Sequence, residues 1–497
     1  MLMLSDDLYK HIPKNHFYEQ LGKILNLDFI YECTRPLYSK KMGRPSLDPV
    51  VFFKCMIAAS FENIIYFTDL EFRLADSLVL RRFIGYELHE RVPDESTIRK
   101  TFQKMPEETC NIIFDHILDI CNANGLIKGN TITTDSTLIE ANASMDSLVH
   151  KELGCSNRDF FMTVRRMNKL DSKQDDDSKQ DDNNKQDDDK ANQKPKKQNI
   201  PQNEIWESST DPDARIMSPR DKRTHLYHRA DAAVDMDTGI ILSAGIEAGD
   251  ISDRTDFLPR IDEAVVALYE RGYNPTVCVA DSGHLNGPNL AGLEESGLIS
   301  VITDRSQNYK WAPGFGRDDF TYVADRDIMT CPEGHELTLR YKPSDYTVYS
   351  CKGATCRACK NFGVCTTNKN GRSVKINGYE RQIKENAERA STEWGQALRW
   401  SRMQRGEAPF AYLKYFGGLR RISTRGLSGA SKRVILASAC WNLLRVIKVL
   451  MGCLPSNSYA FRIFRSIFAI FRRLLKVIWL DYPNIWHQSI QTPNLAV

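Results

Sequence analysis

Apolar and polar residues in the first quarter of the chain are spaced as in helices. Ser46 and Asp48 precede Pro49, a favourable helix start, and the apolar run 50–61 follows. A second start lies at residues 93–97, where Ser and Thr stand ahead of an Ile-Arg-Lys triplet. The pattern predicts that residues 1–125 form an all-helical N-terminal domain. The second helix has the character of a helix-turn-helix recognition helix, but an ordinary capped helix has the same pattern.

The pattern changes after Gly129. Short β-branched or apolar runs predict strands at residues 130–135, 226–234, 239–245 and 275–281. Residues 237–239 predict a hairpin turn between the second and third strands. Residues 254–270 have the apolar spacing of a helix. The order strand, strand, strand, helix, strand predicts an α/β domain with a mixed sheet.

Two segments interrupt this domain. Residues 171–198 contain three near-copies of a six-residue polar unit, which begin at Lys173, Lys179 and Lys185. Such a segment cannot bury enough surface to fold, so we predict a disordered acidic insert and not an acidic catalytic patch. Residues 301–385 form a Cys-rich insertion. The sheet domain then comprises residues 126–300 and 386–455, and residues 456–497 form a basic, amphipathic C-terminal tail.

Composition narrows the class of protein. Lys and Arg total 67 and Asp and Glu 64 in 497 residues, so the net charge of +3 does not by itself identify a nucleic-acid binder. Residues 1–30 lack the apolar core of a secretory signal, and no stretch reaches the roughly 20 uncharged residues of a membrane helix. We expect a soluble, cytoplasmic protein whose 13 cysteines are reduced thiols or metal ligands.

Three carboxylates occupy positions where the surrounding sequence makes an acidic residue unexpected. Asp135 and Asp281 each end a predicted apolar strand, and ligand sites of open α/β sheets gather at the carboxyl ends of strands. Aspartates at strand ends also cap turns. Glu407 is the one acidic residue in the stretch 398–476; the alternative is a surface glutamate paired with an arginine. Converging carboxylates can hold two Mg²⁺ or Mn²⁺ ions about 3.5–4 Å apart for phosphodiester cleavage.

Basic residues surround Glu407. On a helix, residues 407, 411 and 414 share a face, so Lys414 points to the same side as the glutamate. Arginines in this region can bind the DNA backbone through charge. The candidate DNA contacts are Arg402, Lys414, Arg420, Arg421 and Arg425.

Taken together, these segments resemble bacterial insertion-sequence DDE transposases with an RNase H-like catalytic domain. The matching pieces are residues 133–137, 279–283, 402–414, 417–421 and 425–427, and residues 43–46 and 93–97 resemble the N-terminal domain common in that group. The likeness runs from about residue 40 to residue 450. It implies that Asp135, Asp281 and Glu407 are the catalytic, metal-binding triad.

The resemblance also implies a reaction and its partners. The protein would bind double-stranded DNA at the element ends and at a target, with residues 1–125 expected to take part. It would use two Mg²⁺ or Mn²⁺ ions to cleave the DNA and transfer a strand, as a homodimer or a higher oligomer. A non-catalytic DNA-binding protein derived from such an enzyme and a nuclease of the same fold are the alternatives.

Three positions depart from the pattern of the family. Related transposases often carry Tyr and Arg on the glutamate's helix face, one and two turns before it. Here those positions are Trp400 and Met403, and α-helical geometry displaces Arg402 from that face. His284 stands where an aromatic residue is common, and it is either a DNA contact or a polar substitute.

A cysteine cluster lies in the second insertion. Cys356 and Cys359 have the C-x₂-C spacing that suits a tetrahedral Zn²⁺ site. The candidate ligands of one structural zinc ion are Cys331, Cys351, Cys356, Cys359 and Cys365, with His335 as a weaker substitute. The alternative is a set of reduced cysteines that binds no metal.

The C-terminal region is predicted to be helical. Residues 434–450 form an apolar helix that we expect to pack on the sheet. Residues 461–476 are basic and amphipathic, which is typical of a membrane-surface helix. Packing against the body or a second subunit, with arginines toward DNA, agrees better with the rest of the sequence.

Overall fold

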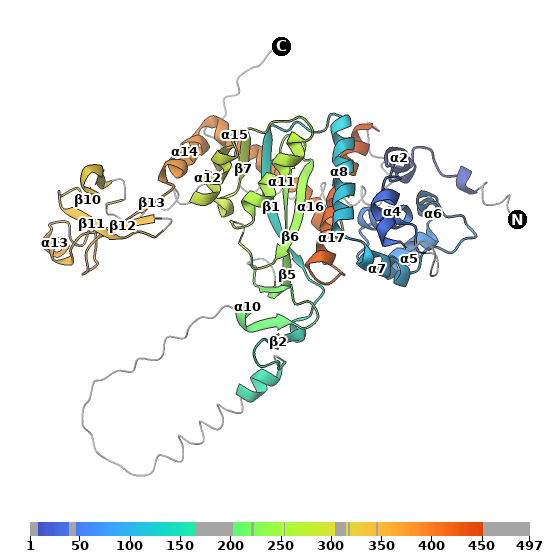
Figure 1. Cartoon of the computed structure of the whole chain (residues 1–497), viewed down its shortest axis with the longest axis horizontal. Helices are drawn as coiled ribbons and strands as arrows, with labels where there is room; N and C mark the ends of the chain where they lie inside the picture. Colours follow the sequence, from blue (N-terminus) through green and yellow to red (C-terminus); the bar gives the residue numbers. More distant parts are fainter. Residues whose placement is uncertain are drawn as a thin grey trace, which may run out of the picture.

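The computed structural model describes residues 8–38, 46–156, 158–164, 202–219, 223–252, 254–303, 315–316, 319–343 and 346–450. Figure 1 shows N-terminal helices on one side, a mixed sheet with its helices in the centre, and a small second sheet on the other side. The predicted acidic insert (171–198), the C-terminal tail (456–497) and the motif residues 43–45 lie outside the described residues.

The N-terminal part is helical, as predicted. Asp48 begins α4 by accepting the N–H groups of Val50 at 2.8 Å and Val51 at 3.1 Å, and Asp94 begins α7 by accepting that of Thr97 at 2.8 Å. Both predicted helix starts are confirmed, because side-chain oxygens satisfy N–H groups that a helix leaves unpaired. The elements here include α2 (Phe17–Ile24), α3 (Ile30–Thr34), η1 (Arg35–Leu37), α4 (Pro49–Phe61), α5 (Phe67–Asp76), α6 (Leu78–Ile84), α7 (Glu95–Lys104) and α8 (Glu107–Ala123).

A six-stranded mixed sheet occupies the centre of the described part. Its middle strand is β1 (Thr131–Glu140), between antiparallel β5 (His225–Asp235) and parallel β7 (Val277–Ala280). Beyond β7 lies parallel β8 (Ile299–Ile302), and on the far side of β5 lie β6 (Ile241–Ala248) and β4 (Arg215–Met217). The predicted α/β class, its strands and the β5–β6 hairpin are confirmed. Gly239 ends the hairpin turn with a φ of 74°, a conformation that favours glycine.

Helices cover both faces of this sheet. α14 (Glu380–Ser391) and α15 (Glu393–Ser401) pack on Val277, Val279 and Val301. The alternate residues of the same strands point the other way, toward α11 (Phe257–Tyr269) and α12 (Gly287–Glu295). The last described helix, α17 (Leu427–Leu450), contacts both β6 and α8. A single hydrophobic core therefore joins the N-terminal helices to the sheet.

Two buried asparagines satisfy the outer strands of the sheet. Asn442 of α17 accepts the N–H of Ile241 in β6 at 2.9 Å and donates to its carbonyl at 2.8 Å. Asn386 of α14 makes the same pair of bonds with Ile302 of β8, both at 2.9 Å. An edge strand leaves N–H and C=O groups unpaired, so each asparagine replaces a missing neighbour strand.

The Cys-rich part forms its own antiparallel sheet. Its order is β13 (Ser373–Asn377), β12 (Tyr346–Ser350), β11 (Glu336–Tyr341), β10 (Ile328–Thr330) and β9 (Thr321–Val323). The short helix α13 (Gly353–Ala358) follows β12. This sheet has a small separate core that includes Met329, Leu337 and Tyr349, and it stands beyond α14, away from the main sheet (Figure 1).

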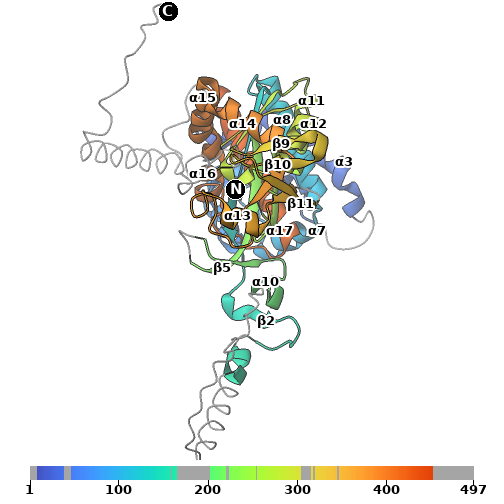
Figure 2. The ribbon, with the colours of Figure 1, turned by 90° about the vertical axis from the view of Figure 1, so that its left-hand side faces the viewer.

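A short hairpin-like pair extends from one end of the main sheet. β2 (Leu148–His150) and β3 (Trp206–Ser208) pair antiparallel, with α10 (Gln202–Ile205) beside them. Figures 1 and 2 both place this group below β5. Among the helices of the described residues, none combines the length and apolar character needed to cross a membrane.

The asparagine on β6 gives a test of this architecture. Asn442→Ala leaves the buried N–H and C=O of Ile241 without partners, at about 1–3 kcal/mol for each unsatisfied group. We expect the free energy of unfolding, measured by urea denaturation, to fall by about 2–6 kcal/mol. Asn442→Leu should not restore it, because volume without hydrogen bonds leaves the strand unpaired. The exposed Asn111→Ala on α8 is the control, and equal effects of Asn442→Ala and Asn111→Ala would contradict the role.

Candidate active site

Asp135 and Asp281 lie on neighbouring parallel strands. Thr133 of β1 pairs with Val279 of β7, and continuing this register by two residues puts Asp135 beside Asp281. Paired residues of adjacent strands point to the same face of the sheet. Asp281 directly follows β7, as predicted, whereas Asp135 lies inside β1. The prediction that Asp135 ends its strand was wrong, because the next residues of β1 continue to pair with β5.

The turn after β7 fixes the Asp281 carboxylate. Within η3 (Ser282–His284), the N–H of Gly283 donates to Oδ1 of Asp281 at 2.9 Å, and Nδ1 of His284 lies 2.7 Å from the same oxygen. A carboxylate can only accept, so the imidazole donates here. His284 is 4% exposed and packs against the ring of Phe257. Its side chain therefore orients Asp281 and is not on the surface, where the sequence left open a contact with DNA.

Glu407 lies on a helical rod with a π-helical turn in its middle. The rod consists of α15, the π turn η7 (Arg402–Gly406) and α16 (Glu407–Tyr415). Pro409 cannot donate to the carbonyl four residues earlier, and its ring crowds that carbonyl. Gly406 lies against β1, where a Cβ would come within 3.1 Å of Thr133 Cγ2. These two residues explain why the rod departs from α-helical geometry at this point.

The π turn brings Arg402 to the carboxylates. Its Nη1 lies 3.6 Å from Asp135 Oδ2 and its Nη2 lies 4.0 Å from Glu407 Oε1. A π-helix closes its hydrogen bonds between residues five apart, so Arg402 and Glu407 share a side of the rod. The prediction that Arg402 is displaced from the glutamate's face was wrong, because it assumed an α-helix. Gly406 and Pro409 were the signal in the sequence.

The two aspartates differ in their electrostatic surroundings. Burial raises the pKa of Asp135 and the charge of Asp281 adds to this, while the N–H of Ser136 and the Arg402 guanidinium oppose it. For Asp281 the hydrogen bond from His284 is the largest effect, and it holds the pKa below its usual value against burial. Perturbed, adjacent carboxyl groups are typical of functional sites.

The carboxylates are close but do not yet form a ligand set. Among the residues that the structure describes, His, Cys, Asp and Glu side chains form no group of three or more arranged to hold a metal ion. Arg402 contacts both Asp135 and Glu407, and the Glu407 side chain is 55% exposed. The site thus presents a pair of aspartates, a nearby glutamate and a cation between them.

Two family models match the chain. A model described as a transposase domain (DUF772) matches residues 6–104, and a model described as a transposase DDE domain matches residues 330–447. The chain belongs to the insertion-sequence DDE transposases. Glu407 lies inside the second match, whereas Asp135 and Asp281 lie outside both.

Solved structures and curated proteins add little to this assignment. The synaptic complex of piggyBac transposase with hairpin DNA is 11% identical, over 97% of this chain and 86% of that chain, with a TM-score of 0.30. The pre-cleavage Mos1 transpososome is 10% identical, over 61% of this chain and 72% of that chain, with a TM-score of 0.17. Such scores carry no argument about fold or function. No match was found among curated proteins.

The predicted DNA contacts of the transposase differ in exposure. Arg420 and Arg425 are exposed, and Lys414 and Arg421 are partly buried. Arg421 also lies 4.0 Å from Glu140, at the end of β1. The side chain of Arg402 is 13% exposed and faces the carboxylates.

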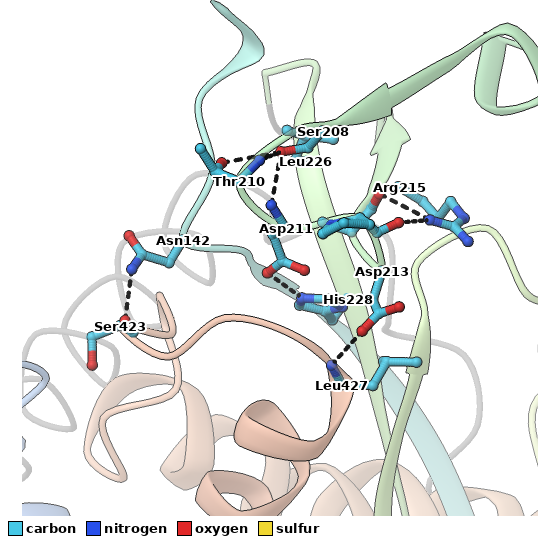
Figure 3. A network of polar contacts seen from close by, with 12 residues as sticks. Asn142, Ser208, Thr210, Asp211, Asp213, Arg215, Leu226, His228, Ser423 and Leu427 are labelled. Atoms are coloured by element: carbon cyan, nitrogen blue, oxygen red, sulfur yellow. Dashed lines mark hydrogen bonds and ion pairs between the residues drawn. The ribbon is translucent and has the colours of Figure 1, made fainter. Parts of the chain in front are cut away.

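A network of polar contacts holds the loop 418–427 that carries these arginines (Figure 3). Asp213 accepts the N–H of Leu427 at 3.0 Å and so begins α17, and Asn142 donates to the carbonyl of Ser423 at 2.6 Å. Behind them, Asp211 lies 3.2 Å from Nε2 of His228, and both side chains are fully buried. These residues, which the sequence analysis did not single out, fix where the loop 418–427 stands relative to β1 and β5.

The Asp211 carboxyl is ionised more easily than usual. Burial raises its pKa, but the hydrogen bond and charge of His228, together with the N–H groups of Gly426 and Asp213, outweigh burial and lower it overall. A group with a lowered pKa in the folded state contributes stability above its unfolded pKa, and this stability is lost as the pH falls through the folded pKa.

The five cysteines of the predicted zinc site gather around one cavity of about 30 Å³, which His335 also lines. The N–H of Arg372 donates to Sγ of Cys356 at 3.3 Å, and burial, with Cys356 nearby, raises the pKa of Cys351 to about 12. No metal-holding group is present in the described part of the chain, so the zinc prediction has no support from this geometry.

The Asp211–His228 pair predicts a pH-dependent contribution to stability. Asp211→Asn should lower the free energy of unfolding of the transposase by about 1–3 kcal/mol above pH ~4. The difference from the unmutated protein should shrink as the pH falls further, because Asp211 is then protonated in both states. Thermal melts from pH 2 to 7 would measure it, with the exposed Asp262→Asn as the control. A difference that stays constant across this range would contradict the ionised pair.

Proposed function

We propose that this transposase cleaves DNA at the ends of its insertion sequence and joins it to a target by two-metal-ion phosphoryl transfer. Asp135, Asp281 and Glu407 would be the metal ligands. The observation that carries the proposal is the register of β1 and β7, which sets two aspartates side by side, with Arg402 linking Asp135 to Glu407. The family assignment supplies the class of reaction.

The residues present suit a hard divalent cation. Burial raises the pKa of Asp135, so its ionised form gains from a positive charge close by. Carboxylate oxygens are the ligands that Mg²⁺ and Mn²⁺ favour. When bound, two such ions would activate the attacking oxygen and stabilise the leaving oxygen of an in-line displacement.

The protein's own residues would orient these ligands. His284 and the Gly283 N–H both bond to Oδ1 of Asp281, which restricts rotation of the carboxylate and would leave Oδ2 to bind metal. The N–H of Ser136 holds Oδ1 of Asp135 at 2.9 Å in the same way. Glu407 stands on the rod that Gly406 lets approach β1. We further propose that the sheet is RNase H-like, which the central place of β1 and its parallel neighbour β7 support.

The surroundings suit double-stranded DNA. Exposed Arg420 and Arg425 lie on the loop after the Glu407 helix, and Lys414 lies on that helix. We propose that these residues and Arg421 bind DNA phosphates, and that residues 1–125 take part in binding element ends. We propose residues 126–300 and 386–455 as the catalytic domain, interrupted by the Cys-rich insertion 301–385. Because an element has two ends, at least two copies of the chain would act together.

Metal-dependent cleavage is the direct test. The purified protein is incubated with linear DNA that carries the element's own ends, with Mg²⁺, Mn²⁺ or EDTA. We expect nicked or cut ends with either metal, and none in EDTA. Asp135→Ala, Asp281→Asn and Glu407→Gln should each lower the cleavage rate by roughly 10²–10³-fold or more, the loss typical of removing one charge-stabilising group.

Binding separates the alternatives. All three variants should still shift the end DNA in a gel, and Glu393→Gln, an exposed change on the same rod, should cleave normally. Cleavage that survives in a triad variant would refute the site assignment. Binding without cleavage by the unmutated protein would favour a non-catalytic DNA-binding protein, and cleavage without joining to a target would favour a nuclease.

The exposed arginines of the loop 418–427 predict how DNA binding depends on salt. The binding constant for DNA falls with salt in proportion to the number of phosphates contacted. Arg425→Ala should therefore weaken binding to all DNA sequences alike and reduce the slope of log K against log[salt] by about 1. Fluorescence anisotropy at several salt concentrations would measure the slope. Arg381→Ala should leave it unchanged, because Arg381 pairs with Glu294 and Glu385; equal slopes for Arg425→Ala and the unmutated protein would remove Arg425 from the interface.

A further inference from the structure

The contacts of Arg402 with two carboxylates of the proposed site depend on the π turn. On an α-helix, residues five apart point in directions that differ by about 140°, because each residue turns by about 100°. In a π-helix the hydrogen bond joins residues five apart, so their side chains lie near the same side of the helix. Arg402 is the first residue of η7, and Glu407, five positions later, is the residue that follows it.

The contacts of Arg402 are ionic. Its two terminal nitrogens lie 3.6 Å from Asp135 Oδ2 and 4.0 Å from Glu407 Oε1, which is beyond ordinary hydrogen-bond length. Nη1 is buried, and within the described residues it has no hydrogen-bond partner. The guanidinium of Arg402 therefore interacts with the two carboxylates through its charge.

The side chains of Trp400 and Met403 do not occupy the space between Asp135 and Glu407. Trp400 is 62% exposed and Met403 is 56% exposed, so the residues that an α-helix would turn toward Glu407's face lie largely in solvent. Gly406 makes room for the arginine, since a Cβ there would come within 3.3 Å of Arg402 Cγ as well as 3.1 Å of Thr133 Cγ2. The π turn, Gly406 and the arginine therefore act as one unit.

We infer that Arg402 is a positioning residue that holds Asp135 and Glu407 together before metal binds, and that the π turn sets its register. This inference rests on the proposed function, because it takes both carboxylates as metal ligands. Two carboxylates drawn to one site repel each other, and a cation between them offsets the repulsion. Divalent ions would supply the same compensation, so the contribution of Arg402 should be largest without metal.

The first experiment measures stability with and without metal. Melting temperatures of Arg402→Met, Arg402→Lys and the unmutated protein are compared in EDTA and during a Mn²⁺ titration without DNA. We expect Arg402→Met to melt several degrees lower in EDTA, with the gap closing as Mn²⁺ rises, and Arg402→Lys to recover part of the loss. Arg405→Met is the matched control, because Arg405 bonds to the Asp237 carbonyl at 3.2 Å, away from the carboxylates.

The outcomes separate the two ideas. A gap for Arg402→Met that is the same with and without Mn²⁺ would overturn the positioning role and leave Arg402 as a packing residue. A melting temperature of the unmutated protein that Mn²⁺ does not raise would instead contradict the metal site of the proposed function. The comparison in EDTA would then decide the role of Arg402 alone.

The second experiment tests the register. The exchange Arg402→Met with Met403→Arg puts an arginine four residues before Glu407, where an α-helix would place it on the glutamate's face. We expect the exchange to melt in EDTA as low as Arg402→Met, because the π turn directs residue 403 outward. Recovery of the unmutated melting temperature would overturn the register.

A deletion provides the converse. Removing the exposed Gln404 shortens the spacing from Arg402 to Glu407 to four residues, which an α-helix keeps on one face. We expect this variant to keep its melting temperature in EDTA and its cleavage rate within a few-fold of the unmutated protein. A loss in EDTA as large as that of Arg402→Met, in a variant that still folds by circular dichroism, would contradict the register.

Discussion

The position of Glu407 depends on two asparagine side chains, which attach the helices before and after it to the edge strands of the main sheet. Glu407 follows the Cys-rich sheet, so its rod must be brought back onto strands formed much earlier in the sequence. Asn386, before the rod, bonds both backbone groups of Ile302 on β8, and Asn442, after it, does the same for Ile241 on β6. The rod is therefore held at both edges of the sheet and passes over the middle, where Gly406 meets β1.

This support sets the electrostatics of the carboxylates. The two aspartates come from rigid neighbouring strands, whereas Glu407 comes from the rod and remains half exposed. Their partners differ accordingly: His284 keeps the Asp281 carboxyl ionised, while burial works against ionisation of Asp135. A cation is most favourable beside the carboxyl group that water stabilises least. Arg402 lies on that side of the site, 3.6 Å from Asp135.

The sequence predicted what local patterns control. Strand runs that end in Asp281 and the helix starts at Asp48 and Asp94 follow from β-branched residues and capping side chains, and the structure agrees with them. It did not predict the extent of β1, which continues past Asp135 to Glu140 along β5. Nor did it place Arg402, since a π turn arises from Pro409 together with the close approach of Gly406 to another element. The roles of Asn386 and Asn442 could not be predicted either, because they depend on burial beside an edge strand, which the local sequence does not reveal.

The pairing of β2 with β3 explains how the main sheet accommodates the long segment between them. The segment that carries the acidic insert leaves and re-enters through the paired strands β2 and β3, so its two ends are joined before it begins. The entropic cost of a loop grows only slowly with its length once its ends are fixed. Directly after this base, Asp211 and Asp213 bond to His228 and to the start of α17. These bonds tie the residues that follow β3 to β5 and to the start of α17, which comes directly after the loop that carries Arg420 and Arg425.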